Sequence, residues 1–212
     1  MARTEQVIRG RLGNAVFYRV NGRTYVRSLP LKYRDACTPV QQFNRQRLMV
    51  AVRFYQRMKD AFLRGVWRVA ARRTPRNGYC LFLKMNMQAF DARTLYDPGN
   101  LVMSLGPLPR LNAPSVSLLA DNRVRVEWKY WSDKEMAHAG ERLCIVVLFE
   151  DRLYSPKVLE GIAACRGDRS ATFGLGEGWC RRAHLYCFFA SPDGGAYSPS
   201  DYLCVTPKAS AA

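Results

Sequence analysis

Arginine and tyrosine are the residues of this sequence whose types and spacing favour a defined chemistry. Tyr18 and Tyr25 stand on either side of Asn21-Gly22, and Arg23 and Arg27 lie just after that turn signal. Guanidinium groups form bidentate hydrogen bonds with phosphate, and aromatic rings stack on nucleobases. The spacing predicts a surface that grips a phosphate and stacks a base. The competing interpretation is ordinary cross-strand packing of the two tyrosines, with the arginines at a solvated rim.

Basic residues are concentrated in the first ninety positions. These positions hold nineteen basic and three acidic residues, whereas the remainder of the chain holds fourteen of each, so the net charge of +16 is confined to the first part. Sixteen of the nineteen are arginine, which suits phosphate contact, although GC-rich codon usage would also enrich arginine. The candidate nucleic-acid-binding residues are Tyr18, Tyr25, Arg23, Arg27, Arg53, Arg57, Arg64, Arg68, Arg72, Arg73 and Arg76.

Two other groups of residues could carry chemistry, but neither forms a complete site. Cys180, His184 and Cys187 offer three ligands where structural zinc takes four, and a strand over 184–190 would point His184 and Cys187 to opposite faces. No third group orients a pairing of His138 or His184 with a cysteine, and no nucleotide-binding or hydrolase motif is present. We therefore expect no metal, no cofactor, no small-molecule substrate and no enzymatic activity. Arg166-Gly167-Asp168 spells an integrin-type tripeptide, but Gly167 and Asp168 are more typical of a turn.

A hairpin and a helix should position the basic residues. Asn21-Gly22 predicts a two-residue turn within residues 14–27, which sets Tyr18 opposite Tyr25. Thr38, Pro39 and Gln41 form a helix start with a capping box, and helical spacing continues to Phe62. Gly65 would break or bend this helix. If the helix continues, Arg53, Arg57, Arg64 and Arg68 share one stripe, which is either an anion site or a solvated outer face. Residues 79–85 predict a short helix or strand that packs on the long helix.

The pattern changes near residues 97–109, where Gly and Pro break the chain. Arg123 to Trp128 alternates as a strand with Trp128 inward, and Cys144–Phe149 reads as a buried strand. Further strands are expected at 115–119, 160–166, 170–175, 184–190 and 201–205, with a hairpin at Asp193-Gly194-Gly195. The predicted fold is α+β: a basic hairpin-and-helix region over 1–98, then an antiparallel immunoglobulin-like or fibronectin-like β-sandwich over 99–212.

The sequence also limits where the protein is expected. The first residues carry no apolar signal segment, and the longest apolar run, Cys144–Phe149, is too short to span a membrane. Seven cysteines, an odd number with no C-x-x-C pair, indicate reduced thiols. We expect a cytoplasmic protein, or a virion component if the gene belongs to a phage, with no membrane partner.

Several stretches carry a resemblance to known proteins. Together they resemble a family of uncharacterised proteins widespread in Bacteroidota, which have an opening hairpin, a Thr-Pro-x-Gln helix start and an immunoglobulin-like C-terminal half. The segment 78–82 after the basic helix also resembles repeats in phage and prophage structural proteins. The resemblance implies no activity and no catalytic residues. The stretches that resemble the family are 13–18, 21–28, 38–42 with 45–47, 186–189, 191–194 and 198–202.

Two functions are compatible with these patterns. In the first, the arginine-rich part binds nucleic acid or another polyanion with little sequence specificity. In the second, the chain is an assembly protein of a virion or mobile element, with the helix packed on neighbouring subunits and the sandwich facing outward. The first depends on the guanidinium groups being gathered on an outward-facing surface and not neutralised by carboxylates.

Overall fold

The computed structural model describes residues 8–20, 22–30, 35–58, 60–72, 74–119, 123–130, 137–176, 179 and 181–207. It contains helices and antiparallel sheets, so the α+β class expected from the sequence is confirmed. The chain divides into two compact units, Met1–Gln42 and Phe43–Ala212. The boundary that the sequence predicts between residues 98 and 99 lies inside the second of these units.

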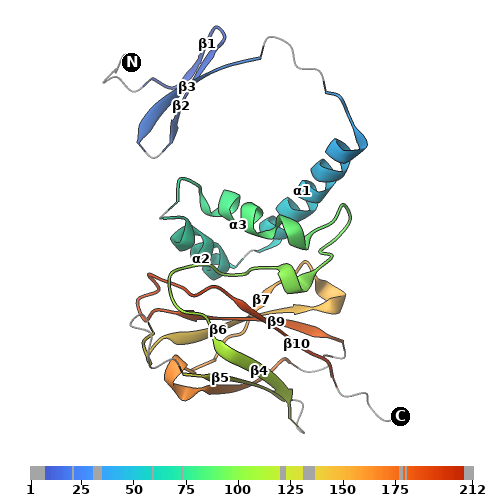
Figure 1. Ribbon diagram of the computed structural model, residues 1–212, viewed down its shortest axis with the longest axis vertical. Coiled ribbons are helices and arrows are strands. Elements are labelled where there is room, and N and C mark those ends of the chain that lie inside the picture. Colours follow the sequence, from blue (N-terminus) through green and yellow to red (C-terminus); the bar gives the residue numbers. More distant parts are fainter. Residues whose placement is uncertain are drawn as a thin grey trace. The chain divides into compact units, whose positions relative to one another are not determined.

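The first unit contains a three-stranded antiparallel sheet (Figure 1). Its strands are β1 (Gly10–Leu12), β2 (Ala15–Val20) and β3 (Arg23–Ser28). The predicted register is confirmed, since Tyr18 pairs with Tyr25 across β2 and β3. Strand β1 was not predicted. It pairs with β2 through a second two-residue turn, in which Gly13 has a φ of +57°, and Gly22 of the predicted turn has a φ of +80°, both favourable for glycine. Asn21 lies outside the described residues.

Helix α1 (Pro39–Arg57) begins as the sequence predicts and ends earlier. Thr38 and Gln41 form the reciprocal capping box, with the Gln41 N–H donating to Thr38 Oγ1 at 3.3 Å and the Thr38 N–H donating to Gln41 Oε1 at 3.2 Å. Helix α2 (Ala61–Ala71) starts after a break, and Gly65 lies within it. Gly65 therefore does not break the helix, and the break lies before it. Asp60 caps α2 by accepting from the Phe62 N–H at 2.7 Å, which stabilises a new helix start at this point.

Helix α3 (Gly78–Asn86) settles the alternative left open for residues 79–85, because this segment is helical. Asn77 caps it by accepting from the Cys80 N–H at 2.8 Å. Phe82 is the main contact of α3 with the other helices. Its ring lies 5.1 Å from that of Tyr55 on α1 and 5.2 Å from that of Trp67 on α2, measured between centroids. The three helices thus share one aromatic cluster.

Two antiparallel sheets complete the second unit. One has the order β10-β9-β6-β7 and the other β4-β5-β8. The predicted strand over 160–166 is wrong. Gly161 has a φ of +75°, and of this segment only Cys165 makes a bridge, to Arg142, before a short 3-10 turn at Arg166–Asp168. The strands are β4 (Asn112–Leu118), β5 (Arg123–Lys129), β6 (Arg142–Phe149), β7 (Lys157–Val158), β8 (Ser170–Gly174), β9 (Ala183–Ala190) and β10 (Asp201–Val205).

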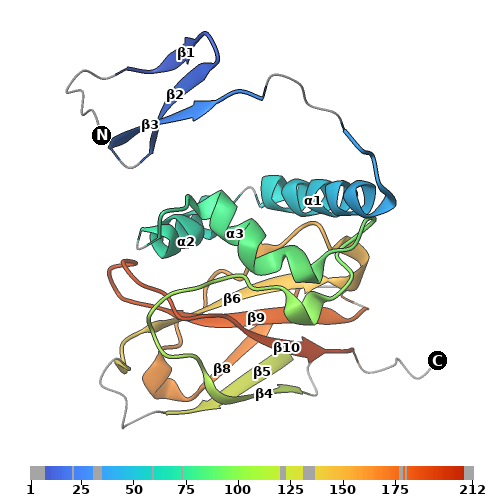
Figure 2. The same cartoon turned by 45° about the horizontal axis from the view of Figure 1, so that its top comes forward.

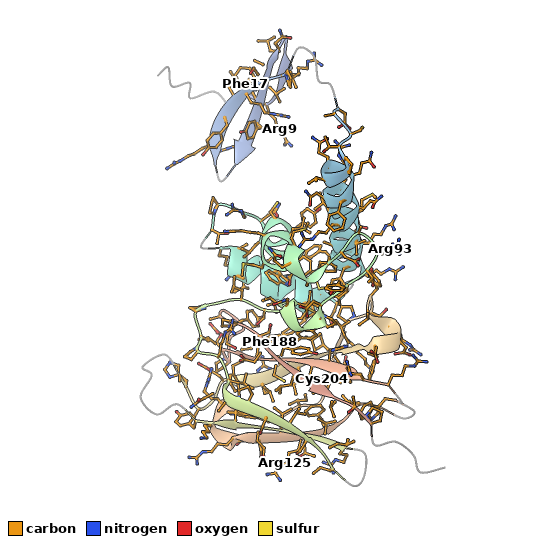
Figure 3. All side chains as sticks on the ribbon, turned by 45° about the vertical axis from the view of Figure 1, so that its right-hand side comes forward. Arg9, Phe17, Arg93, Arg125, Phe188 and Cys204 are labelled. Atoms are coloured by element: carbon orange, nitrogen blue, oxygen red, sulfur yellow. The ribbon has the colours of Figure 1, made fainter. Side chains whose placement is uncertain are left out.

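Strand β9 connects the helices and the sheets of the second unit, because it contributes residues to both hydrophobic cores. All eight of its residues are buried, and they alternate between two hydrophobic cores. Tyr186 and Phe188 pack with the helices, whereas Leu185 and Phe189 pack with the three-stranded sheet. Figures 1 and 2 show this layering, with α2 and α3 over one face of β6 and β9 and with β4 and β5 beyond the other. Phe188 lies on the helical side of the strand (Figure 3).

Candidate nucleic-acid interface

The hairpin presents an aromatic pair beside arginines, as the sequence predicts. The rings of Tyr18 and Tyr25 are stacked with centroids 5.7 Å apart and an interplanar angle of 24°, and the two residues remain 39% and 43% exposed. The register places Arg23 and Arg27 on the same face of the sheet, and both are exposed. A stacked, half-exposed pair leaves ring surface available to a nucleobase, with cationic groups on the same face.

The opposite face of the hairpin carries further cationic and apolar groups. Phe17 is half-buried there, whereas Val26 is exposed, and the Arg19 Nε–H donates to the Gly22 carbonyl at 3.1 Å. Arg9 and Phe17 are labelled on this sheet in Figure 3. Residues 8–30 contain five arginines and no aspartate or glutamate, so this sheet has no acidic side chain of its own to balance its charge.

A second group of candidate residues lines a pocket formed by the three helices. Arg64 and Arg68 lie one turn apart on α2 and border the pocket together with Tyr55 of α1 and Tyr79 of α3. Burial raises the pKa of Tyr55, and the nearby guanidinium groups of Arg64 and Arg68 offset part of this rise. The pocket has a volume of about 620 Å³. Neither Tyr55 nor Tyr79 was among the residues predicted for the site.

Arg64 also holds the break between α1 and α2. Its Nε–H donates to the Met58 carbonyl at 2.9 Å, and its Nη2 donates to the Gln56 carbonyl at 3.2 Å. Gln56 lies in the last turn of α1 and Met58 directly follows the helix, where carbonyl groups lack intrahelical partners. The position of the Arg64 guanidinium group at the pocket is therefore fixed by backbone hydrogen bonds.

Arg53 and Arg57 do not join Arg64 and Arg68 in a single stripe. The stripe requires one continuous helix, and the break after Arg57 removes that condition. Arg53 and Arg57 instead border a smaller pocket of about 210 Å³ with Arg93 and Tyr154. The Arg57 guanidinium carbon lies 5.5 Å from the centre of the Tyr154 ring, within the range of a cation–π contact, and Arg93 projects near α1 (Figure 3).

The remaining candidates lie apart from both pockets. Arg72 is exposed and borders a third hollow, and Arg76 is exposed in the loop before α3. Arg73 lies outside the described residues. Within the part of the chain that the structure describes, none of the predicted arginines has a carboxylate oxygen within 4.0 Å. The predicted arginines that the structure describes in the second unit are thus exposed and have no carboxylate partner among the described residues, but they are divided among several places.

Of the cysteine and histidine candidates, His184 and Cys187 are buried in strand β9, whereas His138 is exposed. His184 and Cys187 lie on opposite faces of β9, as predicted, and His184 Nδ1 lies 2.8 Å from the Tyr202 hydroxyl. Burial raises the pKa of the Cys187 thiol and lowers the pKa of His184. Cys180 lies outside the described residues. Among those described, no group of three or more His, Cys, Asp or Glu side chains is arranged to hold a metal ion.

The Arg-Gly-Asp sequence is part of the structural framework. Arg166 is 1% exposed and donates from Nε to Glu141 Oε2 at 2.6 Å, and its guanidinium carbon lies 3.9 Å from the centre of the Phe189 ring. Arg169, which follows the tripeptide, has a φ of +60° and leads into β8, so the predicted turn is confirmed. The arginine of the tripeptide is therefore not accessible to another protein.

None of the helices in the described ranges has the length and apolar character needed to cross a membrane.

Comparison with known proteins places the chain in a family without assigning an activity. No curated protein matches the sequence. Among solved structures, the fibronectin type III domain of human contactin 1 is similar at 18% identity, with a TM-score of 0.34, over 50% of this chain and 82% of that domain. The resemblance to an uncharacterised family over most of the chain is confirmed, because residues 7–204 match the DUF6266 family, a family of unknown function, and the protein belongs to that family.

Proposed function

We propose that this is a non-enzymatic protein that binds nucleic acid or another polyanion with little sequence specificity. The observation that carries the proposal is the hairpin, where Tyr18 and Tyr25 are stacked and half-exposed on the face that also bears Arg23 and Arg27. The tyrosine rings would stack on bases, and the guanidinium groups would neutralise phosphates. The second unit would add contacts through Arg64 and the other exposed arginines of α1 and α2.

Charge supports an anionic partner over a neutral one. The five arginines of residues 8–30 repel one another, and this repulsion falls when an anion occupies the surface. Little base specificity is expected, because phosphate contacts carry no sequence information and stacking tolerates every base.

The test is a titration of labelled oligonucleotides by fluorescence anisotropy at two salt concentrations. Affinity should fall steeply with salt, because each phosphate neutralised releases counterions. Replacing Arg23 and Arg27 together by Gln removes two cations and should lower the slope of log affinity against log salt by roughly 1.4–1.8. The matched control is the double variant R181Q/R182Q, which removes two exposed cations from the second unit and should leave the slope unchanged. Affinity that does not depend on salt would refute the proposal.

A second candidate function is an assembly protein, favoured by the first half of α1. Val40, Phe43 and Met49 are 69%, 47% and 52% exposed, although helix surfaces of this kind are usually polar. Val40 and Phe43 continue the stripe that Ala51 and Phe54 bury farther along the helix. This apolar segment would pack on a neighbouring subunit of a virion or mobile element. Light scattering would test it, since F43Q should reduce any oligomer to a monomer.

The proposal also includes the arrangement of the two sheets and the place where the protein acts. We propose that the two sheets form a fibronectin-like sandwich, supported by their seven strands and by Trp128, which is buried and packs edge-on against Phe189. The protein would act in the cytoplasm, or in a virion if the gene belongs to a phage.

A further inference from the structure

The pocket between α1, α2 and α3 has a lining of unusual chemistry for a protein surface. Seven residues border it: two arginines, two tyrosines, one glutamine and two small apolar residues, with no acidic side chain among them. Its volume of about 620 Å³ lies within the range of about 300–1,000 Å³ typical of small-ligand sites. The lining residues are Val52, Tyr55, Gln56, Ala61, Arg64, Arg68 and Tyr79.

The aromatic part of the pocket is held in place by packing. Tyr55 and Tyr79 meet edge to face, with ring centroids 5.2 Å apart and an interplanar angle of 63°. The Tyr55 ring is also supported from the protein interior by Phe82, which is fully buried. Beside the rings, Val52 and Ala61 supply apolar contact. A flat, weakly polar group such as a nucleobase fits this lining.

The cationic part of the pocket lies on α2. The Arg64 guanidinium group is fixed by the Met58 and Gln56 carbonyls, and the unused N–H groups of its planar fork remain to bind an anion. Arg68 is exposed, and its side chain makes no hydrogen bond or ion pair with a described residue. The Gln56 side-chain amide adds both a donor and an acceptor for the edge of a base.

We propose that this pocket accepts one unpaired nucleotide of a polynucleotide, with the base against Tyr55 and Tyr79 and its phosphate at Arg64 and Arg68. This inference rests on the proposed function and narrows it to single-stranded nucleic acid. A base stacked and paired in a duplex cannot enter a pocket unless it is flipped out, and flipping requires unstacking and unpairing. Duplex would therefore bind through its phosphates alone, mainly at the hairpin.

The test compares three labelled oligonucleotides of equal length: a single strand, the corresponding duplex and a single strand of abasic sites. The normal single strand should bind about tenfold more tightly than the abasic strand, because stacking on an aromatic ring is worth this much or more per base. R68Q should weaken binding of the normal single strand severalfold and weaken duplex binding much less, because the duplex loses only one phosphate contact. R181Q is the control, since it removes one exposed cation that is not part of the pocket.

The outcomes distinguish failure of the pocket proposal from failure of the proposed polyanion binding. If the normal and abasic strands bind equally, or if R68Q weakens single strand and duplex alike, the pocket does not receive a base, although the proposed polyanion binding stands. If none of the three oligonucleotides binds at low salt, the proposed function itself is wrong. Y79F keeps the ring and should bind like the wild type, whereas Y79A should lose the preference for the normal strand over the abasic strand. Circular dichroism of each variant verifies that it is folded.

Discussion

The buried ion pair between Arg166 and Glu141 gives the sharpest test of what stabilises the second unit. The two side chains are each 1% exposed and are joined from both Nε and Nη2 of the arginine to Glu141 Oε2 at 2.6 Å. Arg166 Nη2 also donates to the Pro109 carbonyl at 2.7 Å, and Nη1 donates to the Arg110 carbonyl at 3.3 Å. One guanidinium group therefore ties together the turn before β8, the loop before β6 and the loop before β4.

The perturbation is R166M, which keeps much of the side-chain volume and removes the charge. It leaves the Glu141 carboxylate buried, with a backbone N–H of His138 at 3.2 Å as its remaining described partner. Removing one member of a buried ion pair typically lowers the free energy of unfolding by about 3–5 kcal/mol. Because the free energy of unfolding falls by about 1–3 kcal/mol per molar urea, R166M should lower the urea midpoint by roughly 1–5 M.

Urea unfolding followed by tryptophan fluorescence measures this loss. Trp128 is a suitable reporter, because its Nε1–H donates to the Arg166 carbonyl at 2.9 Å. The double variant E141L/R166M should be more stable than R166M, since it no longer leaves a lone buried charge. R181Q, an exposed control, should change the free energy of unfolding by less than about 0.5 kcal/mol. A loss below about 1 kcal/mol for R166M, or a double variant less stable than R166M, would refute the reasoning.

Three further predictions concern local structure and ionisation. In Gly78→Ala the new Cβ would lie 2.9 Å from backbone atoms of α2, so this variant should lower the free energy of unfolding by about 1–3 kcal/mol. In Gly65→Ala the new Cβ meets nothing within 4 Å, so this variant should raise the free energy of unfolding by about 0.5–1 kcal/mol in the same urea assay. Burial lowers the pKa of His184 below its ordinary 6.5, so the unfolded chain binds more protons than the folded chain as the pH falls. The free energy of unfolding should therefore fall between pH 7 and pH 5, by at most ~1.4 kcal/mol per pH unit. H184Q should show a smaller fall. Amide hydrogen exchange in β2 and β3 should slow when a bound oligonucleotide is present; unchanged exchange would contradict linkage between binding and hairpin stability.

Local rules predicted the elements that depend on neighbouring residues. Asn21-Gly22 between β-branched and aromatic residues set the register of β2 and β3, and Thr38 with Gln41 set the start of α1. The alternation of Arg123 to Trp128 likewise gave β5 and its inward tryptophan. In each of these cases the signal and the structure lie within a few residues of each other.

Tertiary contacts decided the elements that the sequence did not predict. Helical periodicity runs through residues 58–60, but the Asp60 cap and the hydrogen bonds from Arg64 stabilise a break there. The expected strand over 160–166 contains Gly161 with a φ of +75° and ends in a 3-10 turn at Arg166–Asp168, and Cys165 alone makes a bridge, to Arg142 of β6.

The candidate site also has one part that local sequence signals predict and one part that depends on tertiary packing. The hairpin group was predictable because Tyr18, Tyr25, Arg23 and Arg27 are set by one turn. The pocket was not, because Tyr79 reaches Arg64 and Arg68 only after three helices have packed. Periodicity on a single helix cannot reveal such a grouping, and no local signal marks Tyr79 as a neighbour of these arginines.

The two binding regions differ in what supports them, and this difference determines how each should respond to a ligand. All residues of β1 and β3 are exposed, although a small sheet normally requires a buried apolar face for stability. Repulsion among the arginines of residues 8–30 opposes the folded hairpin further. An anion that binds only the folded form would stabilise it by an amount that grows with the logarithm of the anion concentration above Kd. The helical pocket rests on Phe82 and Phe54, both fully buried, and does not need a ligand to form. Salt should therefore weaken binding chiefly through the hairpin, whereas the choice between paired and unpaired nucleic acid should depend on the pocket.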